Sequence, residues 1–153
     1  MKKKFRNVWI ALLLAFVLIQ FIPNDMPGNK PVKGLDIFEI ADIPDKVGVH
    51  LKNACYDCHS QYVNYPWYAS LAPTSWLVAK DIREGRNELD FSTWGSLSLR
   101  DQLKLLADIA EEVSEETMPL PIYKVIHADA RLSMEQRDLI IRWAESYAEA
   151  LLE

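Results

Sequence analysis

The sequence predicts an all-α protein, in which a body of about four helices follows an apolar N-terminal helix. Four segments repeat apolar residues at the spacing of one helix face, and no segment shows the sustained alternation typical of strands. Glycine is scarce, with 5 among 153 residues, and half of the residues are hydrophobic. Length and composition therefore indicate one globular domain of the helical class.

The N-terminus is basic and then apolar. Three lysines and one arginine lie within the first six residues, before the apolar run Val8–Ile22, whose one polar residue is Gln20. This order is typical of a secretory signal, and no small-residue cleavage pattern follows within Pro23–Pro27. We therefore expect residues 1–23 to form an uncleaved signal anchor, a transmembrane helix, rather than a cleaved signal peptide. A buried helix is disfavoured because the run is apolar on every face.

Such an anchor predicts a single-pass protein of the cytoplasmic membrane whose body lies on the periplasmic, extracytoplasmic side. Residues 24–34 contain two prolines and two glycines and are expected to form a linker. The folded domain is expected to span residues 35–153. Apart from the basic cluster at the terminus, the chain carries 13 basic and 22 acidic residues. This balance argues against a nucleic-acid partner, because phosphate binding requires clustered Lys and Arg.

The first predicted helix of the body spans Pro44–Ala54, since proline is tolerated in a first turn. Val47, Leu51 and Ala54 recur at i, i+4 and i+7 and give it one apolar face. Gly48 lies in its interior, where glycine costs about 1 kcal/mol relative to alanine. We therefore expect this helix to cross the last helix closely at Gly48.

The other three predicted helices have recognisable start or stop signals. The second begins at Pro73–Ser75 and stops at about Gly85. The third spans Ser98–Glu115 and carries an apolar stripe. The fourth runs from Ser133 to the C-terminus, and Ser133 forms a capping box with Gln136.

Both cysteines lie in one C-x-x-C-H motif, Cys55–His59. At this spacing each thiol can form a thioether with a haem vinyl group, while the following imidazole reaches the iron. The motif therefore predicts haem c, one per chain, attached covalently through Cys55 and Cys58 with His59 as the proximal iron ligand. Haem is attached to such motifs after export, so the export signal and the motif support each other.

Three other uses of the cysteines have weaker support. A thioredoxin-like C-x-x-C requires a βαβ context, which the pattern lacks. A structural zinc site needs four ligands, and the chain offers only two cysteines and three histidines with poor finger spacing. A disulfide across two intervening residues would close a short, strained loop.

The second axial ligand must come from another part of the chain. The body offers four candidates, which are Met118, Met134, His50 and His127. Met118 is favoured because Pro119 stiffens its non-helical loop. His127 is the main competitor, and a vacant sixth position is the other alternative. Met134 is expected to be a packing residue, and His50 is expected on the proximal side.

Several further blocks accompany the motif, namely Cys55–Ser60, Tyr65–Tyr68, Ala72–Trp76, Glu84–Arg86, Phe91–Trp94, Met118–Tyr123 and His127–Ser133. With them the sequence resembles the haem-binding-domain family of small monohaem c-type cytochromes, over residues 53–143. The resemblance implies a class I cytochrome c-like bundle around one haem. It also implies attachment through Cys55 and Cys58, with His59 as proximal ligand and Met118 as distal ligand.

Two groups of side chains have two interpretations each. Four aromatic residues are expected to wall the haem pocket as core, namely Trp67, Tyr68, Trp76 and Trp94. The alternative is that the Trp76 N–H or a tyrosine hydroxyl bonds a haem propionate. Three cations of the second predicted helix either pair with propionates or form a solvated face; they are Lys80, Arg83 and Arg86.

The function expected from these features is electron transfer outside the cytoplasm by a membrane-anchored cytochrome that is not an enzyme. Two protein ligands would leave the iron no vacant position for a substrate. The expected partners are redox proteins of a respiratory chain and, through Val8–Ile22, the membrane. The alternative is a peroxidase-like enzyme or a gas or redox sensor, which requires Met118 to be displaceable from the iron.

Overall fold

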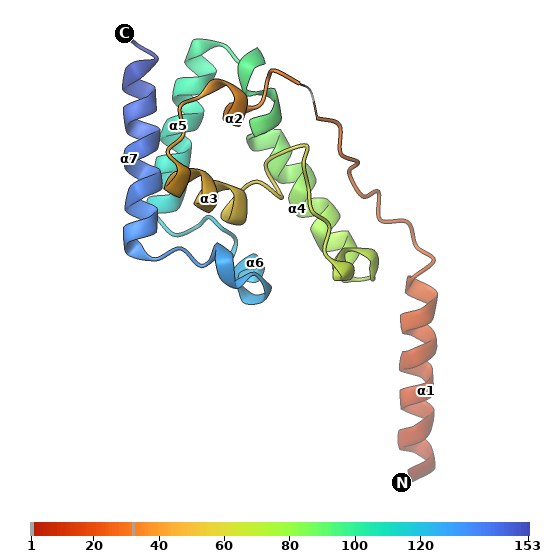
Figure 1. The fold of residues 1–153 in the computed structure, drawn as a ribbon. Coiled ribbons are helices and arrows are strands. Elements are labelled where there is room, and N and C mark those ends of the chain that lie inside the picture. Colours follow the sequence, from red (N-terminus) through yellow and green to blue (C-terminus); the bar gives the residue numbers. More distant parts are fainter. Residues whose placement is uncertain (1, 32) are drawn as a thin grey trace.

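The computed structural model describes residues 2–31 and 33–153 and is shown in Figure 1. These residues form helices and no strand. The seven α-helices are α1 (Lys2–Ile19), α2 (Ile37–Ile40), α3 (Asp45–Ala54), α4 (Thr74–Glu88), α5 (Leu99–Ser114), α6 (Pro121–Ile126) and α7 (Met134–Ala150). Three 3-10 helices also form, η1 (Trp67–Ser70), η2 (Phe91–Ser96) and η3 (Ala128–Ala130).

The predicted fold class is wrong in two respects, and the first is the number of helices. The body after α1 contains six α-helices rather than about four. The additional ones, α2 and α6, have only four and six residues, so neither is long enough to show a helical repeat in the sequence. The side chain of Asp36 caps α2, and Pro121 opens α6.

The second error is the N-terminal anchor. No helix in residues 2–31 and 33–153 is both long and apolar enough to cross a membrane. The physical reason is that the basic residues fall inside α1, which ends at Ile19, so its uninterrupted apolar part is shorter than the roughly 17 residues that a span requires. This finding overturns the predicted signal anchor over residues 1–23 and the predicted single-pass membrane location. Met1 and, in the predicted linker, Val32 lie outside the described residues.

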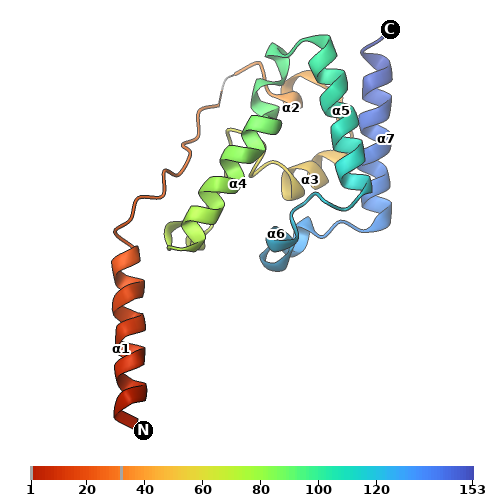
Figure 2. The same cartoon turned by 180° about the vertical axis from the view of Figure 1, so that it is seen from behind.

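The core of the body lies between α5 and α7, which pack side by side in both views (Figures 1 and 2). Helix α3 packs against α7, and η2 packs against α2. Trp94 is completely buried, and its indole N–H donates to the Tyr147 hydroxyl at 3.3 Å. Trp143 donates to the Asp42 carbonyl, also at 3.3 Å. Each indole N–H thus has a hydrogen-bond acceptor, so burial of these large side chains leaves no unpaired donor and costs little free energy.

Gly48 has a different neighbour from the predicted one. It is buried in α3, but a Cβ atom there would meet the Phe38 ring at 3.2 Å and Ile43 at 3.6 Å, and no atom of α7. The missing side chain therefore makes room for α2 and the loop that follows it. Helix α3 does pack against α7, but the space beside Gly48 is filled by Phe38 and Ile43 and not, as predicted, by the last helix.

Candidate functional site

The C-x-x-C-H motif forms a tight turn at the end of α3. Cys55 is the C-cap of this helix, and its N–H donates to the Leu51 carbonyl at 3.0 Å. The Cys55 carbonyl accepts from the N–H of Cys58 at 3.2 Å and from that of His59 at 3.0 Å. The helix end thus continues into a turn that places both thiols and the imidazole on one short segment.

His59 is fixed at its side chain and at its backbone. Its ring atom Nδ1 lies 3.0 Å from the Leu89 carbonyl oxygen, and because a carbonyl only accepts, Nδ1 carries the proton. Its own carbonyl accepts from the Phe91 N–H at 2.8 Å. Burial lowers the pKa of His59, against the opposing effect of carbonyl hydrogen bonds from Leu89 and Gly85. The ring is therefore neutral at pH 7, with the Nε2 lone pair free to bind a metal.

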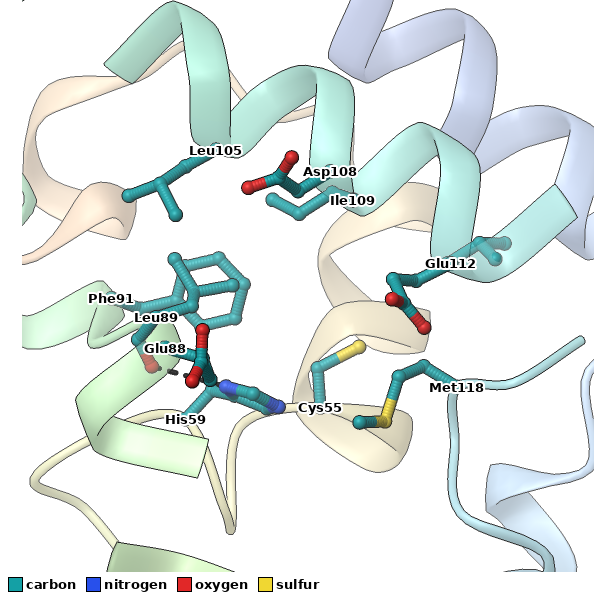
Figure 3. Close-up of a pocket in the computed structure, with 11 residues that line it drawn as sticks. Cys55, His59, Glu88, Leu89, Phe91, Leu105, Asp108, Ile109, Glu112 and Met118 are labelled. Atoms are coloured by element: carbon teal, nitrogen blue, oxygen red, sulfur yellow. Dashed lines mark hydrogen bonds between the residues drawn. The ribbon is translucent and has the colours of Figure 1, made fainter. Parts of the chain in front are cut away.

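Two adjoining cavities meet at this imidazole. The first, of about 250 Å³, lies between the motif and α5, and Figure 3 shows the Cys55 thiol, the His59 ring and the Met118 side chain directed into it. The second, of about 440 Å³, is bordered by Cys58 and by Pro119. His59 and Met118 line both cavities. The structure thus brings together all four residues that the sequence singled out.

Met118 reaches the site from the loop between α5 and α6. Its N–H donates to the Glu112 carbonyl in the last turn of α5 at 3.2 Å, and its peptide bond to Pro119 is cis. The Thr117 hydroxyl bonds the same Glu112 carbonyl at 2.9 Å. Thr117 and Met118 are therefore both hydrogen-bonded to the last turn of α5, which holds the loop in place.

The competing ligand candidates lie elsewhere. His127 lines neither cavity; its ring stacks on Tyr123 with centroids 4.0 Å apart, and its Nε2 is hydrogen-bonded to the Tyr68 hydroxyl. Met134 is 73% exposed at the start of α7. His50 also lines neither cavity. Of the four candidates for a second axial ligand, Met118 alone shares the cavities with His59.

Both cysteines are free thiols in surroundings that oppose ionisation. Burial raises the pKa of Cys55 to about 12, with a smaller contribution from Cys58. Burial also raises the pKa of Cys58 to about 11, helped by the carboxylates of Asp81 and Asp57. Thiol exchange uses thiolates, which these sites disfavour. The described residues also contain no group of three or more His, Cys, Asp or Glu that could hold a metal ion.

The walls of the two cavities are mostly apolar, and the sequence predicted only some of the residues that form them. The lining residues that the sequence interpretation missed include Leu89, Leu105, Ile109 and Val113. Leu105 and Ile109 lie four apart on α5, so the helical repeat could have identified them. Of the four aromatic residues expected as walls, none lines either cavity. Trp67 is 77% exposed, and the Trp76 indole N–H is buried without a partner in the described part of the chain.

The cations considered as propionate partners are also placed elsewhere. Among the described residues that line the two cavities, none is a lysine or an arginine, and the charged members are carboxylates. Lys80 forms an exposed ion pair with Glu84 at 3.7 Å. Arg83 and Arg86 donate to backbone carbonyls of residues 25–28 and of Ser60.

The site fits a haem by its donors and its walls. One neutral imidazole and one thioether line the same apolar space, and two protonated thiols border it, which are the groups that a covalently held haem uses. An all-helical body with such a site defines a haem-binding protein. A family model described as haem-binding domain matches residues 14–146, and the chain belongs to this family. No curated protein and no solved structure matches the chain.

Gly85 provides a test of how the motif is packed. It lies inside α4, which continues past the predicted stop to Glu88, and a Cβ atom there would lie 2.9 Å from the Cys58 carbonyl oxygen. We expect Gly85→Ala to lower stability by about 1–3 kcal/mol through overpacking, although alanine is the better helix former, and to reduce haem loading. Thermal unfolding and the haem-to-protein absorbance ratio measure this.

Gly28→Ala is the matched control, since no atom lies within 4 Å of its added Cβ. It should leave both measurements unchanged. A Gly85→Ala protein as stable and as fully loaded as the wild type would show that the close approach of α4 to the motif is unimportant.

Proposed function

We propose that the chain is a c-type cytochrome that transfers single electrons between redox partner proteins. In this proposal one haem is attached through Cys55 and Cys58, and His59 and Met118 are its axial ligands. The supporting observation is that an imidazole from the end of α3 and a thioether from the loop after α5 line the same two cavities. When bound, haem supplies a one-electron redox centre.

The protonated thiols suit covalent attachment by addition. Cys55 and Cys58 would hold the haem through thioethers, since addition of each S–H across one vinyl group would place the sulfur on one vinyl carbon and the hydrogen on the other. The addition is balanced and needs neither oxidant nor reductant. The raised pKa of each thiol keeps this hydrogen in place at neutral pH, and the turn sets the two sulfurs three residues apart.

The axial residues have distinct tasks. His59 presents Nε2 because Leu89 holds the proton on Nδ1, and such second-shell bonds fix ligand orientation. Met118 presents a neutral sulfur, which favours the reduced iron and raises the reduction potential relative to a second histidine. The apolar side chains of Leu105 and Ile109 line the site from α5 (Figure 3). With both axial positions filled, a carrier is favoured over an enzyme.

An optical and potentiometric titration of the whole haem-loaded chain tests this proposal. We expect low-spin, six-coordinate haem in both oxidation states, one reversible one-electron transition, and a spectrum that added carbon monoxide does not change. A high-spin spectrum, or prompt carbon monoxide binding, would contradict the carrier and favour a peroxidase-like enzyme or a gas sensor.

A further inference from the structure

The segment before α2 is held against the body rather than free. We name residues 25–29 the N-terminal strap; Figures 1 and 2 both show the chain here running beside α4. The Asn29 side chain bonds both backbone groups of Val63: Nδ2 donates to its carbonyl at 2.9 Å, and Oδ1 accepts from its N–H at 3.1 Å. The Tyr65 hydroxyl donates to the Pro27 carbonyl. One amide side chain thus pairs with the loop after the motif as a neighbouring strand would.

Two arginines of α4 hold the strap from the other side. Arg83 Nη1 donates to the Asp25 carbonyl at 2.9 Å. Arg86 Nη1 donates to the Gly28 carbonyl at 3.0 Å, and its Nη2 lies 3.5 Å from Asn29 Oδ1. The third nitrogen, Nε, donates to the Ser60 carbonyl at 2.9 Å. Arg86 therefore joins the strap to the residue that directly follows His59.

The Ser60 carbonyl depends on its hydrogen bond with Arg86, because it has little access to water. The residue is completely buried, so its carbonyl cannot exchange a lost partner for water without a rearrangement of the loop. The planar guanidinium can serve carbonyls on two segments at once, which a lysine ammonium cannot reproduce with the same geometry. The family match begins at residue 14, so the strap lies inside the matched region.

We propose that Arg86 is a positioning residue, which uses the N-terminal strap as a brace to set the backbone after His59 and hence the orientation of the proximal imidazole. This proposal rests on the proposed haem ligation by His59. The ring is held by Leu89, the carbonyl by Phe91, and the following residue by Arg86. The strap is therefore part of the scaffold of the site and not a linker in front of it.

The test compares Arg86→Gln with Arg83→Gln in the haem-loaded whole chain. We expect Arg86→Gln to alter the NMR or EPR signature that reports imidazole orientation. It should also shift the reduction equilibrium toward the oxidised form by about threefold or more, because a nearby cation is lost. Hydrogen exchange of the Val63 amide should accelerate, since the strap is released on the same side. Arg83→Gln removes a hydrogen bond to Asp25, at the end of the strap away from Asn29 and Ser60, so it should keep the wild-type signature and potential.

Two further variants separate positioning from charge. Arg86→Lys keeps the charge, so it should restore most of the potential but neither the imidazole signature nor the slow exchange at Val63. Asn29→Ala, which leaves α4 intact, should accelerate Val63 exchange and alter the imidazole signature. It keeps the test decisive if Arg86→Gln does not fold. Complete rescue by Arg86→Lys, an Arg83→Gln effect as large as that of Arg86→Gln, or a wild-type signature in Asn29→Ala would each overturn the proposal.

Failure of this inference can be distinguished from failure of the proposed function. A wild-type protein with high-spin or freely extractable haem would remove the ligation on which the inference rests. Val63 exchange reports the strap in that protein as well, because it depends only on bonds among the residues of the chain.

Discussion

Replacement of both cysteines by alanine is expected to abolish covalent haem attachment. Cys55 and Cys58 are the only cysteines of the chain, so no other thiol can form a thioether. Haem staining after denaturing electrophoresis and intact mass under denaturing conditions should both show haem in the wild type and none in the double variant. Any residual haem of the double variant, held only by His59 and Met118, should pass into acidic acetone.

The single variants are the controls for this result. Cys55→Ala and Cys58→Ala should each retain a covalent haem at reduced yield, because one thioether remains. A wild-type protein whose haem extracts freely would contradict the proposed covalent attachment, while leaving haem binding by the family domain intact.

Met118→Ala is expected to have the second largest effect, since it changes the coordination of the iron. The oxidised wild-type protein should show the weak far-red charge-transfer band of a sulfur–iron bond. The variant should lose it, bind carbon monoxide and have a lower potential. Met134→Ala should leave the spectrum alone, because Met134 is exposed at the start of α7.

His127→Ala provides the complementary control. His127 is engaged by Tyr68 and Tyr123 outside the two cavities, so its loss should loosen the loop but leave the iron six-coordinate. A wild-type spectrum without the sulfur band and with a low potential would instead assign the sixth position to a histidine. A band that survives in Met118→Ala would assign it to another methionine.

Local chemistry explains which features could be predicted. The C-x-x-C-H turn uses consecutive residues, and Ser133 makes its capping box with Gln136 three residues away, so both are visible in the sequence. Met118 could be singled out because the adjacent proline marks a stiff loop, although its position beside His59 depends on how α5 packs. These features need no knowledge of distant parts of the chain.

The errors arise where distant parts of the chain decide. The N-terminal error is the exception, since it is local: α1 begins at Lys2 and so includes the basic residues. Gly85 resembles a stop signal, but α4 continues because this glycine admits the Cys58 backbone. The bonds of Asn29 and Arg86 join side chains to backbone atoms 26 to 58 residues away, and no periodic pattern encodes such pairs.

The two residues that share the cavities, His59 and Met118, lie 59 positions apart in the sequence. A bond from each to one iron would close a long loop of chain, as a disulfide does, and would restrict the unfolded ensemble. For a loop of this length the chain-entropy argument gives a stabilisation of about 4 kcal/mol. The bonds from His59 and Met118 to the iron would then also cross-link the chain, and the strength of these bonds would change with the oxidation state of the iron. The reduced and oxidised forms would then unfold at different denaturant concentrations, and electron transfer would be thermodynamically coupled to conformational stability.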